Sequence, residues 1–400
     1  MRFFGSRAAR FGLERVVSAG GGFLFAAILV RLHSTEAAAA FFAAWALAAL
    51  FQPVFANAVA PLAVRLWKDD GAGAFLGLWS AMQAAALAIA AFIAVLSDSW
   101  LGVAMTAQIA AAPLALFSAP FVARDRYREL LAVLVPASLF GVSVRTGLLL
   151  SGADLVWAAA AMAIEPLTTG AVLARRSGAF RTRPRITGPA AGVLKDGAPW
   201  LIAAMAATTL FWRSPVLLAD AFLAPAGVVA IALAMQVASG LCLPANALAQ
   251  SLFGPLAAGR AEAARAAVLV ALASGTGAIA ALALAGGPAL AMVYGPSGLA
   301  AAPLALWLAP LAGLAPLWRV DAFTAGLNHR FDGLIRARLT ALAGQAGLAW
   351  LLWSSPNPVI IAAITPLSMA LAIASGPRPD LGALTSPPAF RRSLRLLLQP

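Results

Sequence analysis

The chain has 400 residues, of which 62% are hydrophobic and only 11% are charged. Soluble domains are about 45–50% apolar and about 25% charged, so this composition excludes a water-soluble fold and predicts an integral membrane protein. A single cysteine excludes a disulfide framework and any cysteine-based zinc or iron–sulfur site. We expect the net charge of +13 to mark the loops on one side of the membrane rather than to bind nucleic acid.

The apolar runs predict an all-α polytopic membrane protein. A helix needs roughly 20 apolar residues to cross the hydrocarbon layer, and the chain offers twelve such runs between charged or Pro/Gly-rich breaks. In chain order these candidate spans cover about 13–32, 37–63, 74–96, 101–122, 130–150, 153–174, 197–219, 222–252, 266–286, 299–320, 334–353 and 357–376.

Basic residues gather in alternate loops between these spans. If the N-terminus is cytoplasmic, the cytoplasmic loops and ends collect all but four of the 28 basic residues, with Arg330, Arg336 and Arg338 counted in the loop that leads into the eleventh span. The four others, which lie within or at the edge of spans, are Arg31, Arg145, Arg213 and Arg319. The opposite loops hold no basic residue; they lie around 97–100, 151–154, 287–298 and 354–356. This asymmetry is what the positive-inside rule predicts for twelve helices with both termini in the cytoplasm.

The longest polar stretch, residues 175–196, divides the chain near its middle. We therefore expect an N-terminal six-helix bundle over 1–174, a basic cytoplasmic linker over 175–196, a C-terminal six-helix bundle over 197–376 and a cytoplasmic tail over 377–400. Halving of this kind is typical of transporters built from two repeats.

The second and eighth spans share an order of residues. Each has a proline inside an apolar helix, Pro53 or Pro244, followed by an asparagine, Asn57 or Asn246, a second proline and a basic residue. A proline inside a helix frees a backbone carbonyl, which a membrane tolerates where neighbours or a water-filled cavity satisfy it. One hypothesis is that both helices bend beside a central cavity; the alternative is chance similarity between Ala-rich helices.

The sequence offers no recognisable catalytic set, and we expect no enzyme, cofactor or metal site. No phosphate-binding G-x-x-x-x-G-K-[ST] motif is present. The adjacent acids Asp69 and Asp70 lie in a turn beside Lys68, and His33 and His329 are predicted on opposite sides of the membrane.

Charged residues inside the predicted spans are the main candidates for function, because a charge at mid-membrane costs roughly 2.5–3.5 kcal/mol and usually faces a cavity or a partner. Arg145 and Glu165 lie in adjacent antiparallel spans and could form a buried ion pair. The other hypothesis is that arginines such as Arg145, Arg213 and Arg31 face a common cavity and bind an anion. Arginine suits a diphosphate because its planar fork donates two parallel hydrogen bonds.

Neutral polar side chains inside the spans have two possible uses. They could bind sugars, or they could hold neighbouring helices together. They are Gln52, Asn57, Gln83, Gln108, Gln236, Asn246 and Gln250.

Three stretches resemble polysaccharide flippases. The segment Arg31–Arg65, RLHSTEAAAAFFAAWALAALFQPVFANAVAPLAVR, resembles that family's first-to-second helix region, in which Arg-Leu precedes a short connector and a long apolar helix ending in Pro-Leu and a basic residue. The stretches LPANALAQSLFGPLAAGR and VYGPSGLAAAPLALWLAPLAGLAPLWRVDAFTAGLNHRFDGLIRAR are similar to two later regions. The connector differs, since His33-Ser34-Thr35 replaces the family's Gly-Pro.

This resemblance implies a lipid-linked oligosaccharide flippase of the multidrug/oligosaccharidyl-lipid/polysaccharide exporter superfamily. Two six-helix bundles would surround a central cavity and work by alternating access, without ATP hydrolysis. The implied substrate is an undecaprenyl-diphosphate-linked oligosaccharide for O-antigen, capsule or exopolysaccharide synthesis, with membrane lipids and polysaccharide assembly proteins as further partners. Arginines on cavity helices hold the diphosphate in such proteins, and Arg31 and Arg213 match them best.

Three alternatives remain open. A drug/cation antiporter of the same superfamily needs a carboxylate in its cavity, and Glu165 is the only acid deep in a predicted span. A membrane subunit that scaffolds glycosyltransferases would need no transport activity. A flippase for lipid-linked peptidoglycan precursors usually carries two additional helices, which counts against it. The Ala-rich composition and the preference for Arg over Lys suggest a bacterial inner membrane.

Overall fold

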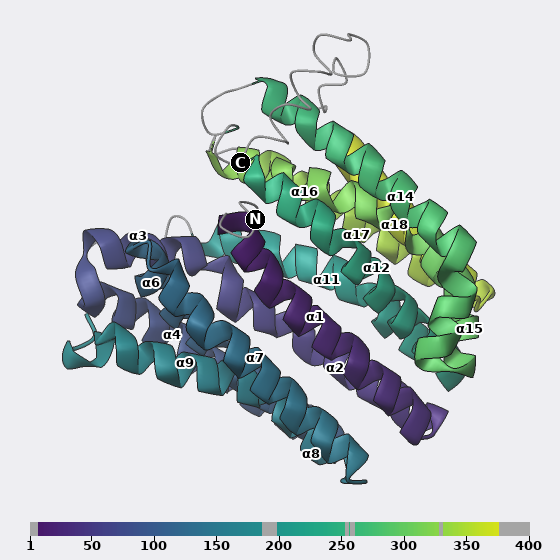
Figure 1. Ribbon diagram of the computed structural model, residues 1–400, viewed down its shortest axis with the longest axis horizontal. Helices are drawn as coiled ribbons and strands as arrows, with labels where there is room; N and C mark the ends of the chain where they lie inside the picture. The colour runs from purple at the N-terminus through teal and green to yellow at the C-terminus, as the bar shows by residue number, and fades with distance from the viewer. Residues whose placement is uncertain (1–6, 186–197, 253–255, 257–260, 328–330, 376–400) are drawn as a thin grey trace. The chain divides into compact units, whose positions relative to one another are not determined.

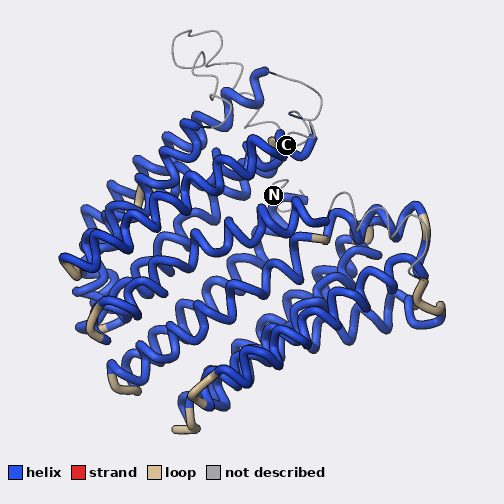
Figure 2. Tube along the Cα trace, turned by 180° about the vertical axis from the view of Figure 1, so that it is seen from behind, coloured by secondary structure: helices blue, strands red, loops and turns tan. Residues whose placement is uncertain are grey.

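The computed structural model describes residues 7–185, 198–252, 256, 261–327 and 331–375 (Figure 1). Within these ranges all regular elements are helices, and no strand occurs (Figure 2). The predicted all-α polytopic fold is therefore confirmed.

The chain divides into two compact units. One, here called the N-terminal unit, is Gly20–Arg213, and the other, the C-terminal unit, is Ser214–Pro400 together with Met1–Ala19. The division falls inside two helices, between Ala19 and Gly20 and between Arg213 and Ser214. The predicted bundle boundaries at 174 and 197 stay a prediction.

The helices of the first half are mostly long and apolar. They are α1 (Arg7–Leu32), α2 (Thr35–Pro53), the π-helix η2 (Val54–Ala58), α3 (Ala60–Asp69), α4 (Gly71–Leu96), α5 (Trp100–Ala111), the 3₁₀ segment η3 (Ala112–Ser118), α6 (Ala119–Ala123), α7 (Tyr127–Leu150), α8 (Leu155–Ala160), the 3₁₀ turn η4 (Ala161–Ala163), α9 (Ile164–Ser177) and the 3₁₀ turn η5 (Ala179–Arg181). The second half has longer unbroken helices. They are α11 (Ala198–Phe222), α12 (Pro225–Ser251), α14 (Ala261–Tyr294), α15 (Pro296–Leu308), α16 (Leu311–Leu327), α17 (Phe331–Ser354) and α18 (Pro358–Ser375).

A helix covers part of every predicted span, but the number twelve is not confirmed. Among the described residues, nine helices are long and apolar enough to cross a membrane, and the pair α15 and α16, bent by 48°, makes up to ten. The apolar part of α1, Ala19–Leu32, is shorter. The chain is thus a multi-pass membrane protein by length and apolarity of its helices.

Proline marks the break in the second predicted span. α2 ends at Pro53, and the chain continues as η2 before α3 begins at Ala60. Proline has no N–H to donate and its ring crowds the preceding turn, so the regular α pattern stops there. In the eighth span, by contrast, α12 continues through Pro244 as one α-helix. The two spans therefore share an order of residues but not a helix geometry.

The predicted outer loop over 287–298 is wrong. α14 continues through Pro288 to Tyr294, α15 begins at Pro296, and Gly295 alone connects them with a φ of 64°. Glycine adopts this left-handed conformation without steric cost. The Gly and Pro residues of this stretch suggested a loop, but membrane helices tolerate both.

Close backbone contact between small residues joins α14 and α16. A methyl group added at Gly313 would lie 2.6 Å from the carbonyl oxygen of Ala271 and 3.1 Å from the Cα of Gly275. Membrane helices associate through such small residues because lipid provides no hydrophobic force between them.

Candidate functional site: charged side chains within the helices

Arg145 lies in the interior of the N-terminal unit. Its side chain projects from α7 and is only 9% exposed. The guanidinium lies 5.8 Å from the ring centre of Phe25 in α1, and Nη1 lies 3.4 Å from the sulfur of Met162 in η4. A thioether is a weak acceptor, and Nε has no hydrogen-bond partner among the described residues. Arg145 is thus a buried cation with donors left over.

Glu165 does not form the ion pair with Arg145 that was one of the two predicted arrangements. Arg145 and Glu165 belong to neither of the ion pairs Arg65–Asp69, at 3.5 Å, and Arg126–Glu129, at 2.5 Å, which both lie on exposed surfaces. Glu165 instead accepts a hydrogen bond from the hydroxyl of Ser138, two turns before Arg145 on α7. A charged acceptor makes this hydrogen bond stronger than a neutral one. Glu165 of α9 therefore bonds to α7, whereas Arg145 of α7 contacts η4 and α1.

Arg213 lies near the end of the N-terminal unit, in α11. Its guanidinium is 5.3 Å from the ring centre of Trp45 in α2, and its side chain is half-buried. No carboxylate of the described residues lies within ion-pair distance of it. Tryptophan attracts a cation to its face and leaves the edge of the guanidinium fork free to donate.

Arg31 stands in the last turn of α1 and is exposed. A cation is favoured at this position because the helix C-terminus carries a partial negative charge. Ser34 then begins α2 as its N-cap, with Oγ accepting from the N–H of Ala37 at 3.3 Å. The predicted role of Arg31 toward a cavity stays a prediction.

The two predicted asparagines differ. The side chain of Asn57 lies outside the described residues, although its backbone belongs to η2. Asn246 is buried in α12, in the C-terminal unit, and its Oδ1 has no hydrogen-bond partner among the described residues.

Some of the glutamines join helices. Nε2 of Gln83 donates to the carbonyl oxygen of Ala110 at 2.8 Å, and Nε2 of Gln108 donates to Oε1 of Gln52 at 3.4 Å. These bonds connect α4 with α5 and α2 with α5, as expected for polar contacts between membrane helices.

Arg338 was assigned to a cytoplasmic loop from its sequence, and this assignment is wrong. It lies about two turns into α17 and is only 2% exposed. Its guanidinium lies 3.4 Å from the ring centre of Trp318 in α16, and Nη2 donates to the carbonyl oxygen of Trp318 at 3.1 Å. The predicted span 334–353 already contained this residue, so counting charges by span rather than by loop could have found it.

The structure thus joins Glu165 to Ser138, places Arg145 against Met162 and Phe25 and Arg213 on Trp45, and has Asn246 in the C-terminal unit. The common cavity predicted for the arginines stays a prediction. In the described part of the chain, no group of three or more His, Cys, Asp or Glu side chains could hold a metal ion. His329, one of the two histidines, lies outside that part.

Comparison with solved structures shows the class of fold. The structure is similar to the lipid II flippase MurJ in its inward closed conformation, with a TM-score of 0.72, 10% identity and coverage of 97% of this chain and 90% of that chain. It is also similar to an inward-facing multidrug resistance MATE transporter of the MOP superfamily, with a TM-score of 0.63, 13% identity and coverage of 98% and 99%. A eukaryotic MATE transporter gives a TM-score of 0.53 at 15% identity, with coverage of 97% of each chain.

These similarities establish that the chain shares the fold of a lipid II flippase and of MATE transporters. No protein-family profile and no curated protein sequence matches the chain. At 10–15% identity the likeness concerns the fold and carries no substrate with it. The neighbours are transporters rather than enzymes.

Proposed function

We propose that the protein flips an undecaprenyl-diphosphate-linked oligosaccharide across the bacterial inner membrane by alternating access, for O-antigen, capsule or exopolysaccharide synthesis. The observation that carries the proposal is Arg213, a cation within a membrane helix that rests on Trp45 and has no carboxylate partner among the described residues. A site that keeps an arginine without a counter-ion inside the membrane favours an anionic ligand.

Other features of the chain support this choice. Arg145 is a buried cation whose Nε has no hydrogen-bond partner among the described residues. A solved structure with a similar fold is a lipid II flippase, which supports the choice of a flippase. In the proposed arrangement both termini are cytoplasmic, and polysaccharide assembly proteins are the expected partners.

A multidrug antiporter coupled to a cation is the second candidate, because two of the similar structures are multidrug MATE transporters and Glu165 provides an intramembrane carboxylate. Such a protein would use Glu165 to exchange a proton or sodium ion against a cationic drug. The excess of buried arginines over buried acids disfavours a cationic substrate.

The test is flipping of a fluorescent undecaprenyl-diphosphate sugar in proteoliposomes. We expect activity in the wild type, an at least tenfold loss in Arg213→Ala and Arg31→Ala, and normal activity in Arg126→Gln, whose charge is already paired with Glu129. All variants must be shown to be folded and inserted. Efflux of a cationic dye driven by a proton gradient, without flipping, would establish the antiporter instead. A protein that shows neither flipping nor dye efflux would favour the scaffold.

A further inference from the structure

The segment after α9 is packed onto the N-terminal unit instead of leading away from it. α9 ends at Ser177, its C-cap Gly178 has a φ of 70°, and Ala179 in the following 3₁₀ turn is fully buried. Further on, the N–H of Arg185 donates to the carbonyl oxygen of Gly73 in α4 at 2.9 Å. We call Gly178–Arg185 the α9 extension. It belongs to the stretch that the sequence identified only as a basic linker.

An aromatic side chain of the α9 extension lies at the surface. The ring of Phe180 is 5.6 Å from that of Trp79 and 5.3 Å from that of Phe117, so the protein holds it in place. Phe180 is nevertheless 59% exposed. An ordered, exposed ring at the end of membrane helices is typical of residues that enter the boundary between headgroups and acyl chains.

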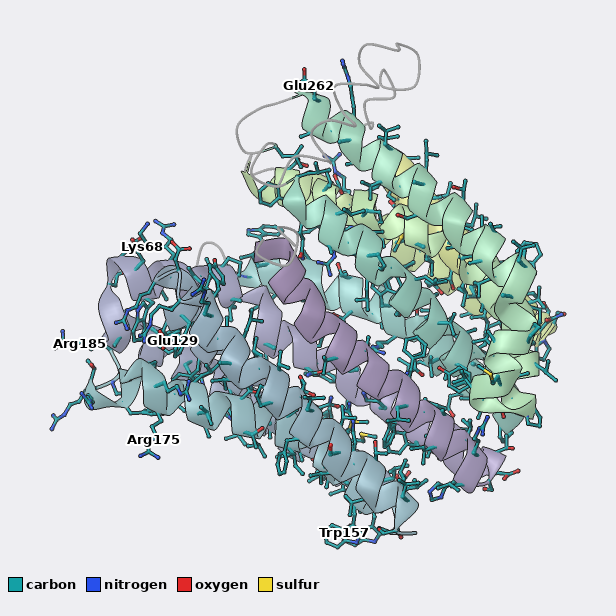
Figure 3. All side chains as sticks on the ribbon, viewed as in Figure 1. Lys68, Glu129, Trp157, Arg175, Arg185 and Glu262 are labelled. Atoms are coloured by element: carbon teal, nitrogen blue, oxygen red, sulfur yellow. The ribbon has the colours of Figure 1, made fainter. Side chains whose placement is uncertain are left out.

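Exposed arginines follow this ring in the α9 extension. Arg181, Arg183 and Arg185 are all exposed, and the stem of Arg185 packs along Gly73, with Cγ and Cδ each 3.5 Å from a Cβ built there. Figure 3 shows Arg185, Arg175 and Lys68 at the same end of the unit, with Trp157 at the opposite end.

Two carboxylates of the N-terminal unit form ion pairs with arginines outside the α9 extension. Asp69 pairs with Arg65, and Glu129 pairs with Arg126. Arg181, Arg183 and Arg185 have no ion pair with any described carboxylate. The α9 extension therefore presents three exposed positive charges near an apolar ring, without an ion pair to a described carboxylate.

We propose that the α9 extension binds the phosphate headgroup of an anionic phospholipid at the membrane surface, with Phe180 inserted among the acyl chains. Arginine donates bidentate hydrogen bonds to phosphate, and bases close to an anionic bilayer gain about 1 kcal/mol each. A soluble acidic protein would satisfy the charges but would leave the ring in water, which is why we favour a lipid. The proposal goes beyond the transport activity, since it holds for any transported substrate.

The experiment is native mass spectrometry of the delipidated full-length protein, titrated with phosphatidylglycerol or phosphatidylcholine. We expect the wild type to prefer phosphatidylglycerol, and Arg183→Gln/Arg185→Gln to bind it about 10- to 30-fold more weakly, as two lost charges imply. The matched control, Arg265→Gln/Arg336→Gln, removes two charges from α14 and α17 and should bind nearly as the wild type does. Phe180→Ser should weaken binding of phosphatidylglycerol while keeping the headgroup preference.

Equal affinity of the wild type for the two lipids would overturn the proposal. An equal loss of affinity for phosphatidylglycerol in the two double variants would also overturn it. Binding of a polyglutamate peptide without any lipid preference would also overturn it, and would point to an acidic protein partner. Size-exclusion chromatography must show that every variant remains folded. None of these outcomes depends on whether the protein flips its proposed substrate.

Discussion

Arg145 and Arg338 are both buried arginines in membrane helices, yet the protein holds them differently. Arg338 lies 3.4 Å from the ring centre of Trp318 and donates to a backbone carbonyl. Arg145 lies 5.8 Å from the ring centre of Phe25, and its Nη1 donates to the sulfur of Met162. The comparison teaches that burial alone does not mark a binding residue. Arg338 makes a close ring contact and a backbone hydrogen bond, although its Nε and Nη1 have no partner among the described residues, whereas the contacts of Arg145 are longer and weaker.

The largest effect on stability is expected at Arg338. Arg338→Gln removes a desolvated cation–π contact and a charged hydrogen bond, and should lower the free energy of unfolding by about 2–4 kcal/mol. Thermal unfolding of the purified protein measures this loss. Arg336→Gln, two residues earlier and exposed, is the matched control and should change little. Equal melting temperatures for the two variants would show that Arg338 does not hold α16 and α17 together.

A smaller loss of stability is expected at Arg145. Arg145→Gln should cost about 1 kcal/mol, because the thioether contact is weak and the charge has no direct partner. If Arg145 binds substrate, the same variant should reduce flipping at least tenfold. Melting temperature and flipping rate, measured on one preparation, separate the two effects. If Arg145→Gln unfolds as readily as Arg338→Gln but flips substrate normally, then Arg145 stabilises the fold and does not bind substrate.

The smallest effect concerns the neutral hydrogen bond between α2 and α5. Gln108→Leu should cost about 0.6 kcal/mol, the average for hydrogen bonds between membrane helices. A double-mutant cycle with Gln52→Leu measures the coupling directly. A coupling energy near zero would assign these glutamines to another task, such as contact with a sugar.

Apolar run length predicts which stretches are helical, because the bilayer sets the length that a helix needs. It does not predict where the helix type changes. Pro53 indicated a break that the structure shows as η2, but Pro244 gave the same signal inside a continuous α12. The difference depends on tertiary neighbours, which no local pattern contains.

The charges of the candidate site were predicted in part. Their location inside helices follows from the sequence, so Arg145, Glu165 and Arg213 were found. Their partners depend on helix rotation and packing, which the sequence does not give. The hydrogen bond between Glu165 and Ser138 was therefore not predicted. Arg338 was missed because a base near the start of a span resembles a loop residue, and only the fold shows it against Trp318.

The central claim is that Arg213 recognises a diphosphate. Its most direct test is the affinity of the purified protein for fluorescent undecaprenyl diphosphate, compared among wild type, Arg213→Lys and Arg213→Ala. Lysine keeps the charge but loses the planar fork, so we expect affinity to fall about tenfold for Arg213→Lys and further for Arg213→Ala. Equal affinity of all three folded proteins would contradict the claim.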